Sequence, residues 1–386
     1  MIGKARIGLG VTAVGVALAL ASCGGGGLSS DSGGDAAATT GDITLGMVTP
    51  LSGSSAAIGP YMKNGAQLAI NEINTSGGVL GRQLKLVAED GACDPKTAAA
   101  AASKLVTAGV TVSVGGYCSS ATLPTLSIFG KADIPMIIPA ANSTDLIKDK
   151  LPNVFLLNGT GAQQAQAAAD FMKSSGLKAA ALIDDNTSYS KDITTRTAAD
   201  LQGQSTKVVN QQSVTAGEQD YSAAVTAMLR ANPDIIYWTG YYQEGGLIIK
   251  QLRAAGYKGK IMVADGSVDK QLVTIAGKDN AQGVLATMTQ TPQTIPGGDA
   301  WIASYKKAFS SDPGPYSTQS YDAVRVAAEA IKNAGNTNGK DIIAALEKID
   351  GFKIFSGSLK FTPDHTLSEG GFDILVVKGN DFALNK

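Results

Sequence analysis

One stretch decides the fold: VTVSVGGYCSS, residues 110–120. Its β-branched first half predicts a buried strand, and residues 122–131 beyond it predict a helix. The two glycines let the backbone approach a ligand closely. A helix start offers free N–H groups, and the Ser119 hydroxyl lies beside them, so this strand-to-helix turn suits a carboxylate. Ser119 can also serve only as the cap of the helix, and both interpretations stay open.

The same order of strand, loop and helix recurs along the chain from residue 42. The two series of predicted strands cover residues 43–48, 83–89, 110–114 and 134–139, then 179–183, 206–212, 234–239 and 260–264. Two such series predict an α/β protein with two doubly wound parallel sheets. Ligands of such sheets bind beyond the carboxyl ends of the strands, so we expect a cleft between two lobes.

The composition of the chain argues against several classes of function. The chain of 386 residues carries 32 basic and 33 acidic side chains, which argues against a nucleic-acid partner. His365 is the single histidine, so histidine metal centres and Ser-His-Asp catalysis are not expected, and its turn-like surroundings place it at the surface. The sequence has no phosphate-binding loop and no dinucleotide fingerprint. We therefore expect no cofactor, no metal and no enzymatic activity.

The N-terminus predicts export. A short basic region precedes the apolar run 7–20, and small residues then lead to Cys23, a pattern typical of a signal peptide over residues 1–22. The last four residues resemble a bacterial lipobox, which predicts a lipid on Cys23; an ordinary cleaved signal or an uncleaved anchor is the alternative. Residues 23–41 predict a flexible tether. We expect an extracytoplasmic protein, anchored through lipid in the periplasm or at the outer cell surface.

Two cysteines remain in the folded part, Cys93 and Cys118. An even pair in an oxidising compartment predicts a disulfide. In the chain-entropy description such a bridge stabilises the fold by about 3 kcal/mol. It would also hold the turn at Cys118 and Ser119 in place. Two buried free thiols are the alternative.

A free amino acid presents a carboxylate and an ammonium, and the sequence offers a group for each. Asp265 follows a strand and precedes a glycine, where it can pair with an ammonium through a charge-assisted hydrogen bond. Backbone carbonyls near Ala140 can accept from the other ammonium protons. Four tyrosines with an apolar face and a polar tip can wall the cleft: Tyr117, Tyr189, Tyr241 and Tyr316. Asp265 can instead cap the next helix, and each tyrosine can instead be packing.

Seven short motifs, in this order, give the chain a family resemblance. They are TPLSG at 49–53, NGA at 64–66, EDGACDP at 89–95, YCSS at 117–120, PAA at 139–141, TAGEQDY at 215–221 and GYY at 240–242. With them the chain resembles the periplasmic Leu/Ile/Val-binding proteins, the substrate-binding components of branched-chain amino acid ABC transporters. The resemblance covers residues 42–386.

The resemblance implies a two-lobed periplasmic-binding-protein fold of type I, with two parallel sheets joined by three hinge crossings. By analogy the crossings lie near residues 159–161, 287–289 and 365–369. Lobe one then comprises residues 42–160 and 288–367, and lobe two comprises 161–287 and 368–386.

The resemblance also implies roles for single residues. Cys93 and Cys118 match the family disulfide, Ser119 the serine that holds the ligand carboxylate, and Asp265 the acid that pairs with the ammonium. The stretch Ala140-Ala141-Asn142 matches the loop whose first carbonyl takes the ammonium. Three tyrosines match aromatic lining positions: Tyr189, Tyr241 and Tyr316.

Four positions depart from the family pattern. Asn142 stands for a threonine, and Asp265 is one methylene shorter than the usual glutamate. Ile58 stands for an aromatic lining residue. Tyr117 stands for a smaller or aliphatic one, so it is expected to shrink or polarise the side-chain pocket.

These observations predict a monomeric receptor that captures a free amino acid, Leu, Ile, Val or a related neutral one, and delivers it to the permease subunits of an ABC importer. The alternative is a sensor that binds another small amino acid or an amide and signals to a membrane partner. A surface hydrolase is the enzymatic alternative, and it would need an activated nucleophile.

Overall fold

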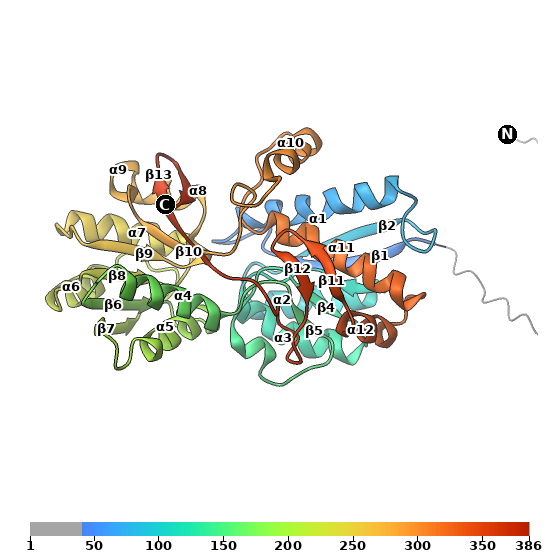
Figure 1. Cartoon of the computed structure of the whole chain (residues 1–386), viewed down its shortest axis with the longest axis horizontal. Helices are drawn as coiled ribbons and strands as arrows, with labels where there is room; N and C mark the ends of the chain where they lie inside the picture. The colour runs from blue at the N-terminus through green and yellow to red at the C-terminus, as the bar shows by residue number, and fades with distance from the viewer. Residues whose placement is uncertain (1–40, 386) are drawn as a thin grey trace, which may run out of the picture. The chain divides into compact units, whose positions relative to one another are not determined.

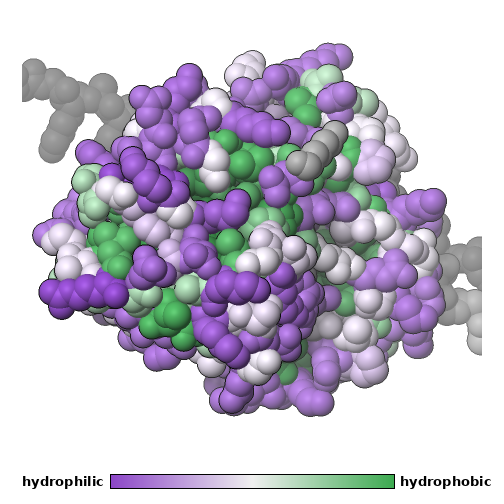
Figure 2. Space-filling view, turned by 60° about the vertical axis from the view of Figure 1, so that its left-hand side comes forward, coloured by the Kyte–Doolittle hydropathy of each residue, from purple (hydrophilic) through white to green (hydrophobic). Residues whose placement is uncertain are grey.

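A computed structural model describes residues 41–385. The predicted signal peptide, the predicted lipidation residue Cys23 and the predicted tether up to residue 40 lie outside the described residues. Within residues 41–385, no helix has both the length and the apolar character that crossing a membrane requires. Hydrophilic residues cover most of the face drawn in Figure 2, and hydrophobic residues show between them in small groups.

The first sheet has five parallel strands in the order β2-β1-β3-β4-β5. They are β1 (Ile43–Thr49), β2 (Leu84–Asp90), β3 (Val112–Ser113), β4 (Met136–Ile138) and β5 (Val154–Leu156). The helical segments between them are α1 (Ile58–Thr75), α2 (Pro95–Thr107), α3 (Ser119–Lys131) and η1 (Thr144–Ile147). All but one residue of β1 are buried, as expected for a parallel strand covered on both faces.

The stretch at 110–120 forms a strand and a turn as predicted. β3 itself is short, but the backbone N–H groups of Thr111, Val114 and Gly116 continue its pairing with β1. A Cβ atom at Gly115 would lie 2.5 Å from the backbone nitrogen of Val48, so glycine here lets the turn pass close to β1. At Gly115 the close approach is therefore to a neighbouring strand.

The second sheet has seven strands in the order β14-β13-β10-β9-β8-β6-β7. They are β6 (Ala179–Asp184), β7 (Lys207–Ser213), β8 (Ile235–Trp238), β9 (Lys260–Val263), β10 (Leu285–Met288), β13 (Asp373–Lys378) and β14 (Asp381–Leu384). Its helical segments are α4 (Gly161–Ser174), α5 (Ser188–Asp200), α6 (Ser222–Arg230), α7 (Tyr242–Ala254), η2 (Asp265–Ser267), α8 (Lys270–Ala276) and α9 (Lys278–Ala281).

One edge of this sheet is antiparallel, which the expectation of parallel sheets did not include. β13 pairs antiparallel with β10, and β14 pairs antiparallel with β13. A parallel neighbour needs a helical crossover, whereas β13 and β14 are joined by a short turn. The remaining neighbours, from β10 to β7, are all parallel.

Between β10 and β13 the chain returns to the first sheet. It forms α10 (Gly298–Phe309), α11 (Ser317–Ala334), α12 (Gly339–Glu347) and the hairpin β11–β12 (Asp350–Ile354 and Gly357–Lys360). α11 packs along α1 (Figure 1), and the contact is close because a Cβ atom at Gly65 would lie 2.0 Å from the Ser317 carbonyl oxygen. The chain therefore passes between the sheets three times, after β5, after β10 and before β13, and the predicted fold class is confirmed.

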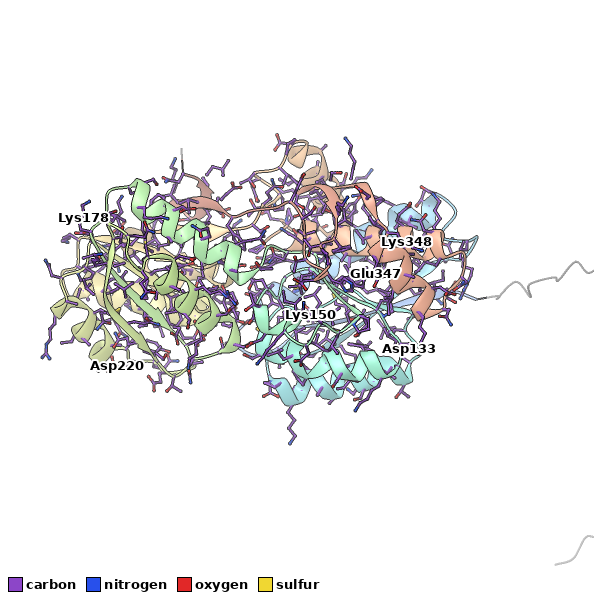
Figure 3. The ribbon with its side chains drawn as sticks, turned by 60° about the horizontal axis from the view of Figure 1, so that its bottom comes forward. Asp133, Lys150, Lys178, Asp220, Glu347 and Lys348 are labelled. Atoms are coloured by element: carbon purple, nitrogen blue, oxygen red, sulfur yellow. A yellow bond between two sulfur atoms is a disulfide. The ribbon has the colours of Figure 1, made fainter. Side chains whose placement is uncertain are left out.

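Surface side chains mark the two halves in Figure 3. Lys178 and Asp220 lie on the side of the second sheet, and Asp133, Lys150, Glu347 and Lys348 lie on the side of the first. The residue bounds of the two lobes, as given by analogy, stay a prediction.

The expectation that His365 lies at the surface was wrong. Its side chain is 15% exposed, and its ring stacks on Phe155 with a centroid distance of 4.1 Å. Its Nδ1 lies 3.0 Å from the Val154 carbonyl oxygen, and the backbone N–H of Leu156 donates to its own carbonyl at 2.9 Å. The loop pairs with the edge strand β5, and this pairing turns the imidazole inward.

The predicted disulfide is present between Cys93 and Cys118, whose Cα atoms are 5.3 Å apart. Cys93 lies in the loop between β2 and α2, and Cys118 is the N-cap residue of α3. The bridge therefore fixes the start of α3, where Ser119 is the first helical residue.

We expect the double substitution Cys93→Ala with Cys118→Ala to lower the free energy of unfolding by about 3 kcal/mol, because the bridge restrains a loop in the unfolded chain. Urea unfolding followed by circular dichroism measures this loss. The parent protein under reducing conditions, in which the bridge is opened without a substitution, is the control. A midpoint equal to that of the parent protein would show that the bridge does not stabilise the fold.

Candidate functional site

Asp265 is the centre of a buried polar cluster between the two sheets. It follows β9, opens η2 and is 2% exposed. Its Oδ1 accepts hydrogen bonds from the Tyr189 hydroxyl at 2.5 Å, from Gln164 Nε2 at 2.8 Å and from the Gly266 backbone N–H at 3.1 Å. Its Oδ2 accepts from the Tyr316 hydroxyl at 2.7 Å. Every one of these donors is neutral.

The surroundings of Asp265 act on the pKa of its carboxyl in two directions. Burial raises the pKa of the carboxyl, and the hydrogen bonds from Tyr189, Tyr316 and Gln164 act in the opposite direction because they favour the charged form. Burial and the neighbouring carboxylate raise the pKa of the Tyr189 and Tyr316 hydroxyls well above the usual value, so both remain donors. A buried carboxylate held only by neutral groups is suited to a cationic partner.

Four tyrosines form an arc that begins and ends at Asp265. Ring centroids are 5.5 Å apart for Tyr316 and Tyr117, 5.8 Å for Tyr117 and Tyr241, and 5.1 Å for Tyr241 and Tyr189. The Tyr117 hydroxyl lies 3.4 Å from the Gly266 carbonyl oxygen. The structure thus brings together the four tyrosines and the acid that the sequence singled out.

The start of α3 faces the same region. Ser119 is fully buried, and its Oγ accepts from the Ser143 backbone N–H at 3.2 Å. The Ala140 carbonyl accepts from Asn158 Nδ2 at 2.8 Å, which leaves one lone pair of that oxygen. The Ala141 N–H donates to the Gly116 carbonyl at 3.1 Å, so this residue ties the loop to the turn before α3.

Ile58 shares an apolar cluster with two of the tyrosine candidates. It is the first residue of α1, is 1% exposed, and belongs to the large apolar cluster that also contains Tyr117 and Tyr316. The structure therefore shows it as a core residue on the side of the first sheet. Its part in ligand binding stays a prediction, as do the ligand roles of the other candidates.

Gln164 is a residue of this cluster that the sequence analysis missed. It lies in α4, is fully buried, and bonds to Asp265, to Asn142 and to Thr287. The buried residues of α4 include Ala165, Ala168 and Met172 with it. A glutamine on the apolar face of an otherwise regular helix was the available signal, since buried polar side chains are the informative exception.

Polar contacts also join the two halves at the rims. The Thr144 N–H and hydroxyl donate to Asp192 at 2.9 and 2.8 Å, and Arg196 donates to both Asp192 and Thr144. On another edge the Tyr242 hydroxyl donates to the Ser54 carbonyl at 2.6 Å. These bonds hold elements after the first-sheet strands β1 and β4 against α5 and α7 of the second sheet. The structure is therefore a closed arrangement of the two sheets.

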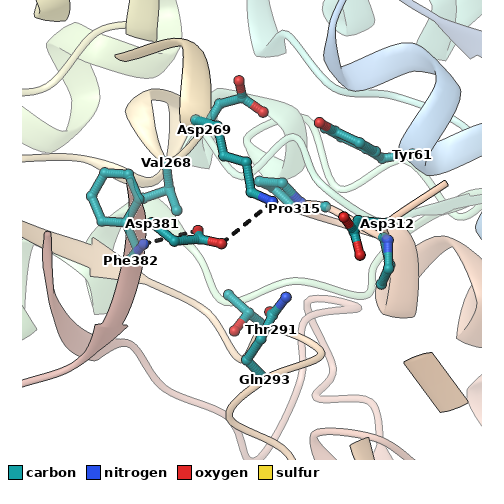
Figure 4. A pocket seen from close by; sticks show the side chains of 12 residues that line it. Tyr61, Val268, Asp269, Thr291, Gln293, Asp312, Pro315, Asp381 and Phe382 are labelled. Atoms are coloured by element: carbon teal, nitrogen blue, oxygen red, sulfur yellow. Dashed lines mark hydrogen bonds and ion pairs between the residues drawn. The ribbon is translucent and has the colours of Figure 1, made fainter. Parts of the chain in front are cut away.

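A surface pocket separate from the Asp265 cluster is drawn in Figure 4. It is lined by Tyr61 of α1, by Asp269, by Thr291 and by Lys270, whose Nζ lies 3.5 Å from Asp381. None of the predicted ligand-binding residues lines it. Among residues 41–385 no group of three or more histidine, cysteine or acidic side chains is arranged to hold a metal ion.

The fold and the buried site between its sheets define a two-lobed periplasmic binding protein of type I. Residues 42–380 match the family model described as "Periplasmic binding protein". The chain belongs to this family, whose members are substrate-binding proteins and not enzymes.

Two relatives over most of the chain are named as binding proteins for branched-chain amino acids. The chain is 32% identical to "Leu/Ile/Val-binding protein homolog 3" of Brucella melitensis, over 88% of this chain and 93% of the relative. It is 30% identical to the "Leucine-, isoleucine-, valine-, threonine-, and alanine-binding protein" of Pseudomonas aeruginosa, over 86% and 89%. The resemblance expected from the motifs is confirmed.

Two solved structures of binding proteins share this fold. A leucine binding protein LivK from Thermotoga maritima superposes with a TM-score of 0.83 at 25% identity, covering 89% of this chain and 98% of that one. The substrate binding protein LivJ from Streptococcus pneumoniae, in complex with isoleucine, gives 0.81 at 26% identity, covering 89% and 100%.

We expect Asp192→Ala to shift the ligand-free protein toward an open form, because it removes the acceptor shared by Thr144 and Arg196 at the rim. Loss of a partly buried charged acceptor costs about 1–3 kcal/mol. Small-angle X-ray scattering of the parent and the variant measures the change as a larger radius of gyration. Asp170→Ala, which removes an exposed acid of α4, is the control. Equal radii for the parent and Asp192→Ala would contradict a role of this contact in closure.

Proposed function

We propose that the protein is an extracytoplasmic substrate-binding protein that captures a free neutral amino acid between its two lobes and delivers it to an ABC importer. The observation that carries this proposal is the buried carboxylate of Asp265, which has neutral hydrogen-bond donors around it. An ammonium is the natural partner of such a group. The names of the relatives, which include leucine, isoleucine, valine, threonine and alanine, support the same ligand class.

The zwitterion has a place for each charge. The ammonium pairs with Asp265 and the Ala140 carbonyl, and the carboxylate accepts from the Ser119 hydroxyl and the free N–H groups at the start of α3. Asp265 lies on the second proposed lobe, whereas Ser119 and Ala140 lie on the first, so a single ligand bridges both. Binding therefore favours the closed form over the open one by the free energy of contacts that only the closed form makes.

The proposed lobes are residues 42–160 with 288–367 and residues 161–287 with 368–386. This division follows sheet membership, because β1 to β5 fall in the first lobe while β6 to β10, β13 and β14 fall in the second or at its boundary. The hinge crossings near residues 159–161, 287–289 and 365–369 connect them.

The export signal over residues 1–22 and the lipid on Cys23 complete the proposal. A lipid-anchored receptor with a tether reaches a membrane permease without a membrane span of its own, and a single ligand-binding chain acts as a monomer. These features support delivery of the ligand to an importer, because the receptor and its permease partner then lie at the same membrane.

We expect Asp265→Ala to weaken binding of L-leucine, L-isoleucine, L-valine or L-alanine at least about hundredfold, because it leaves the buried ammonium unpaired. Ser119→Ala removes one hydroxyl donor and should weaken binding about tenfold. Isothermal titration calorimetry measures both, after a thermal-shift screen of all common amino acids has identified the strongest ligand. Asp299→Ala, an exposed acid of α10, is the control. Unchanged affinity of Asp265→Ala would overturn the site assignment, and no stabilisation by any amino acid would overturn the proposed function.

We expect Tyr117→Leu to favour larger aliphatic ligands, because the Tyr117 ring fills space beside Tyr241 and Tyr316. The ratio of L-leucine to L-alanine affinity should rise about tenfold or more, as one or a few methylene groups are worth about 1–3 kcal/mol in an apolar pocket. Competition binding gives this ratio directly. Tyr117→Phe keeps the ring and should keep the ratio. The same ratio in Tyr117→Leu and the parent would show that the ring does not face the ligand side chain.

A further inference from the structure

A second surface pocket, on the side of the first sheet, contains the single histidine of the chain. His365 lines it together with Glu347, the last residue of α12, and with Lys150 and Asp364. Figure 3 labels Glu347 and Lys150 on this side of the molecule. The lining of the pocket, within residues 41–385, includes none of the proposed ligand-binding residues. The pocket is therefore separate from the amino acid site.

The neighbours of His365 fix the plane of its ring and the position of its proton. The ring stacks on Phe155 with a centroid distance of 4.1 Å and an angle of 6° between the planes. Its Nδ1 lies 3.0 Å from the Val154 carbonyl oxygen, which can only accept, so Nδ1 carries the proton. In the neutral ring Nε2 is then the nitrogen with the free lone pair. A backbone carbonyl commonly orients a metal-binding histidine in this way.

The Nε2 atom faces a carboxylate. It lies 3.5 Å from Glu347 Oε1, and an ionised carboxylate can only accept. Two acceptors that face each other need a positive charge between them, either a proton on Nε2 or a metal ion. The Glu347 side chain is 48% exposed, so an ion can reach the pair from solvent.

The distance between the two atoms favours a metal ion over a proton. Zinc binds imidazole nitrogen at about 2.0–2.1 Å and carboxylate oxygen at about 2.0–2.2 Å, which at a tetrahedral angle places the two ligand atoms about 3.4 Å apart. The observed separation of 3.5 Å is close to this value. A direct hydrogen bond from a protonated ring to a carboxylate is shorter, at about 2.7–2.9 Å.

The charges that line the pocket also favour a cation. Lys150 Nζ lies 3.0 Å from Asp364 Oδ1, so these two opposite charges offset each other. With a neutral His365 ring, Glu347 then leaves the pocket with a net negative charge.

We propose that His365 Nε2 and Glu347 bind a divalent transition-metal ion, with zinc as the best fit, and that water completes its coordination. The class of ion follows from the ligands, because imidazole suits zinc, copper and nickel, whereas magnesium and calcium prefer oxygen. Two protein ligands are fewer than catalytic and structural zinc centres use, so the ion exchanges readily. The single histidine excludes a histidine cluster but leaves room for such a pair. The site is independent of the proposed amino acid binding.

The bound ion joins two segments of the first half. Glu347 ends α12, and His365 lies where the third proposed crossing begins. The unfolded chain does not hold these two ligands together, so the ion binds the folded form preferentially and stabilises it.

Copper(II) tests the assignment of the imidazole. The full chain, without a histidine tag, is mixed with less than one equivalent of Cu²⁺ at neutral pH and studied by pulsed electron paramagnetic resonance. Because His365 is the single histidine, coupling of copper to an imidazole nitrogen arises only there. We expect this coupling in the parent and its loss in His365→Asn. Asparagine tolerates the left-handed backbone at position 365, where φ is 56°.

Glu347→Gln tests the carboxylate and leaves the imidazole unchanged. We expect calorimetry to show zinc binding at least about tenfold weaker in Glu347→Gln than in the parent. Asp341→Asn, which changes an exposed acid of the same helix, is the control and should bind zinc as the parent does. Zinc should raise the melting temperature of the parent and of Asp341→Asn, a chelator should reverse the rise, and His365→Asn and Glu347→Gln should show little of it.

Two results would overturn the metal site. One is a copper spectrum of the parent without coupling to an imidazole nitrogen. The other is equal zinc affinity in the parent, His365→Asn and Glu347→Gln. In either case a proton on Nε2 joins His365 to Glu347, and the pair is an ordinary ion pair.

Discussion

The rest of the site depends on a single buried negative charge. Asp265 lies where β9 ends, and the hydroxyls of Tyr189 and Tyr316 and the amide of Gln164 all turn toward it. Such a charge is costly to bury unless its partners are well placed, so each neighbour is fixed in both position and polarity. The directions in which Tyr189, Tyr316 and Gln164 point are consequences of this requirement.

Topology explains why these residues meet. The parallel strands of each sheet end at the same edge, and the loops beyond those ends carry Tyr117, Asn142, Tyr241 and Asp265. The two edges face one another, so residues from distant parts of the sequence reach one small volume (Figure 1). The disulfide fixes the start of α3 in the first half, while the rim contact between Thr144 and Asp192 involves both halves. The first half of the site is thus held by a covalent bond, and its relation to the second half is held by hydrogen bonds.

Much of this could be predicted from the sequence. Strand and helix periodicity predicted the two sheets, and the cysteine count predicted the bridge. The position of Asp265 before a glycine at a strand end pointed to the region between the sheets, where the structure has its buried polar cluster. Features set by contacts between distant segments could not be predicted. The inward position of His365 depends on pairing with β5, and the antiparallel edge formed by β13 depends on where the chain returns. Gln164 was missed because helical periodicity reports burial and not the polar partner that makes burial acceptable.

The packing of α1 against α11 has a consequence for biosynthesis. The Tyr321 hydroxyl of α11 donates to Glu72 of α1, and these two residues are 249 positions apart in the chain. The core of the first half therefore cannot close until nearly all of the polypeptide has been made, and the second half waits for its edge strands β13 and β14 at the C-terminal end. Contacts of such long sequence separation slow folding. Both halves therefore complete their folds late, only after segments from the C-terminal part of residues 41–385 have been made.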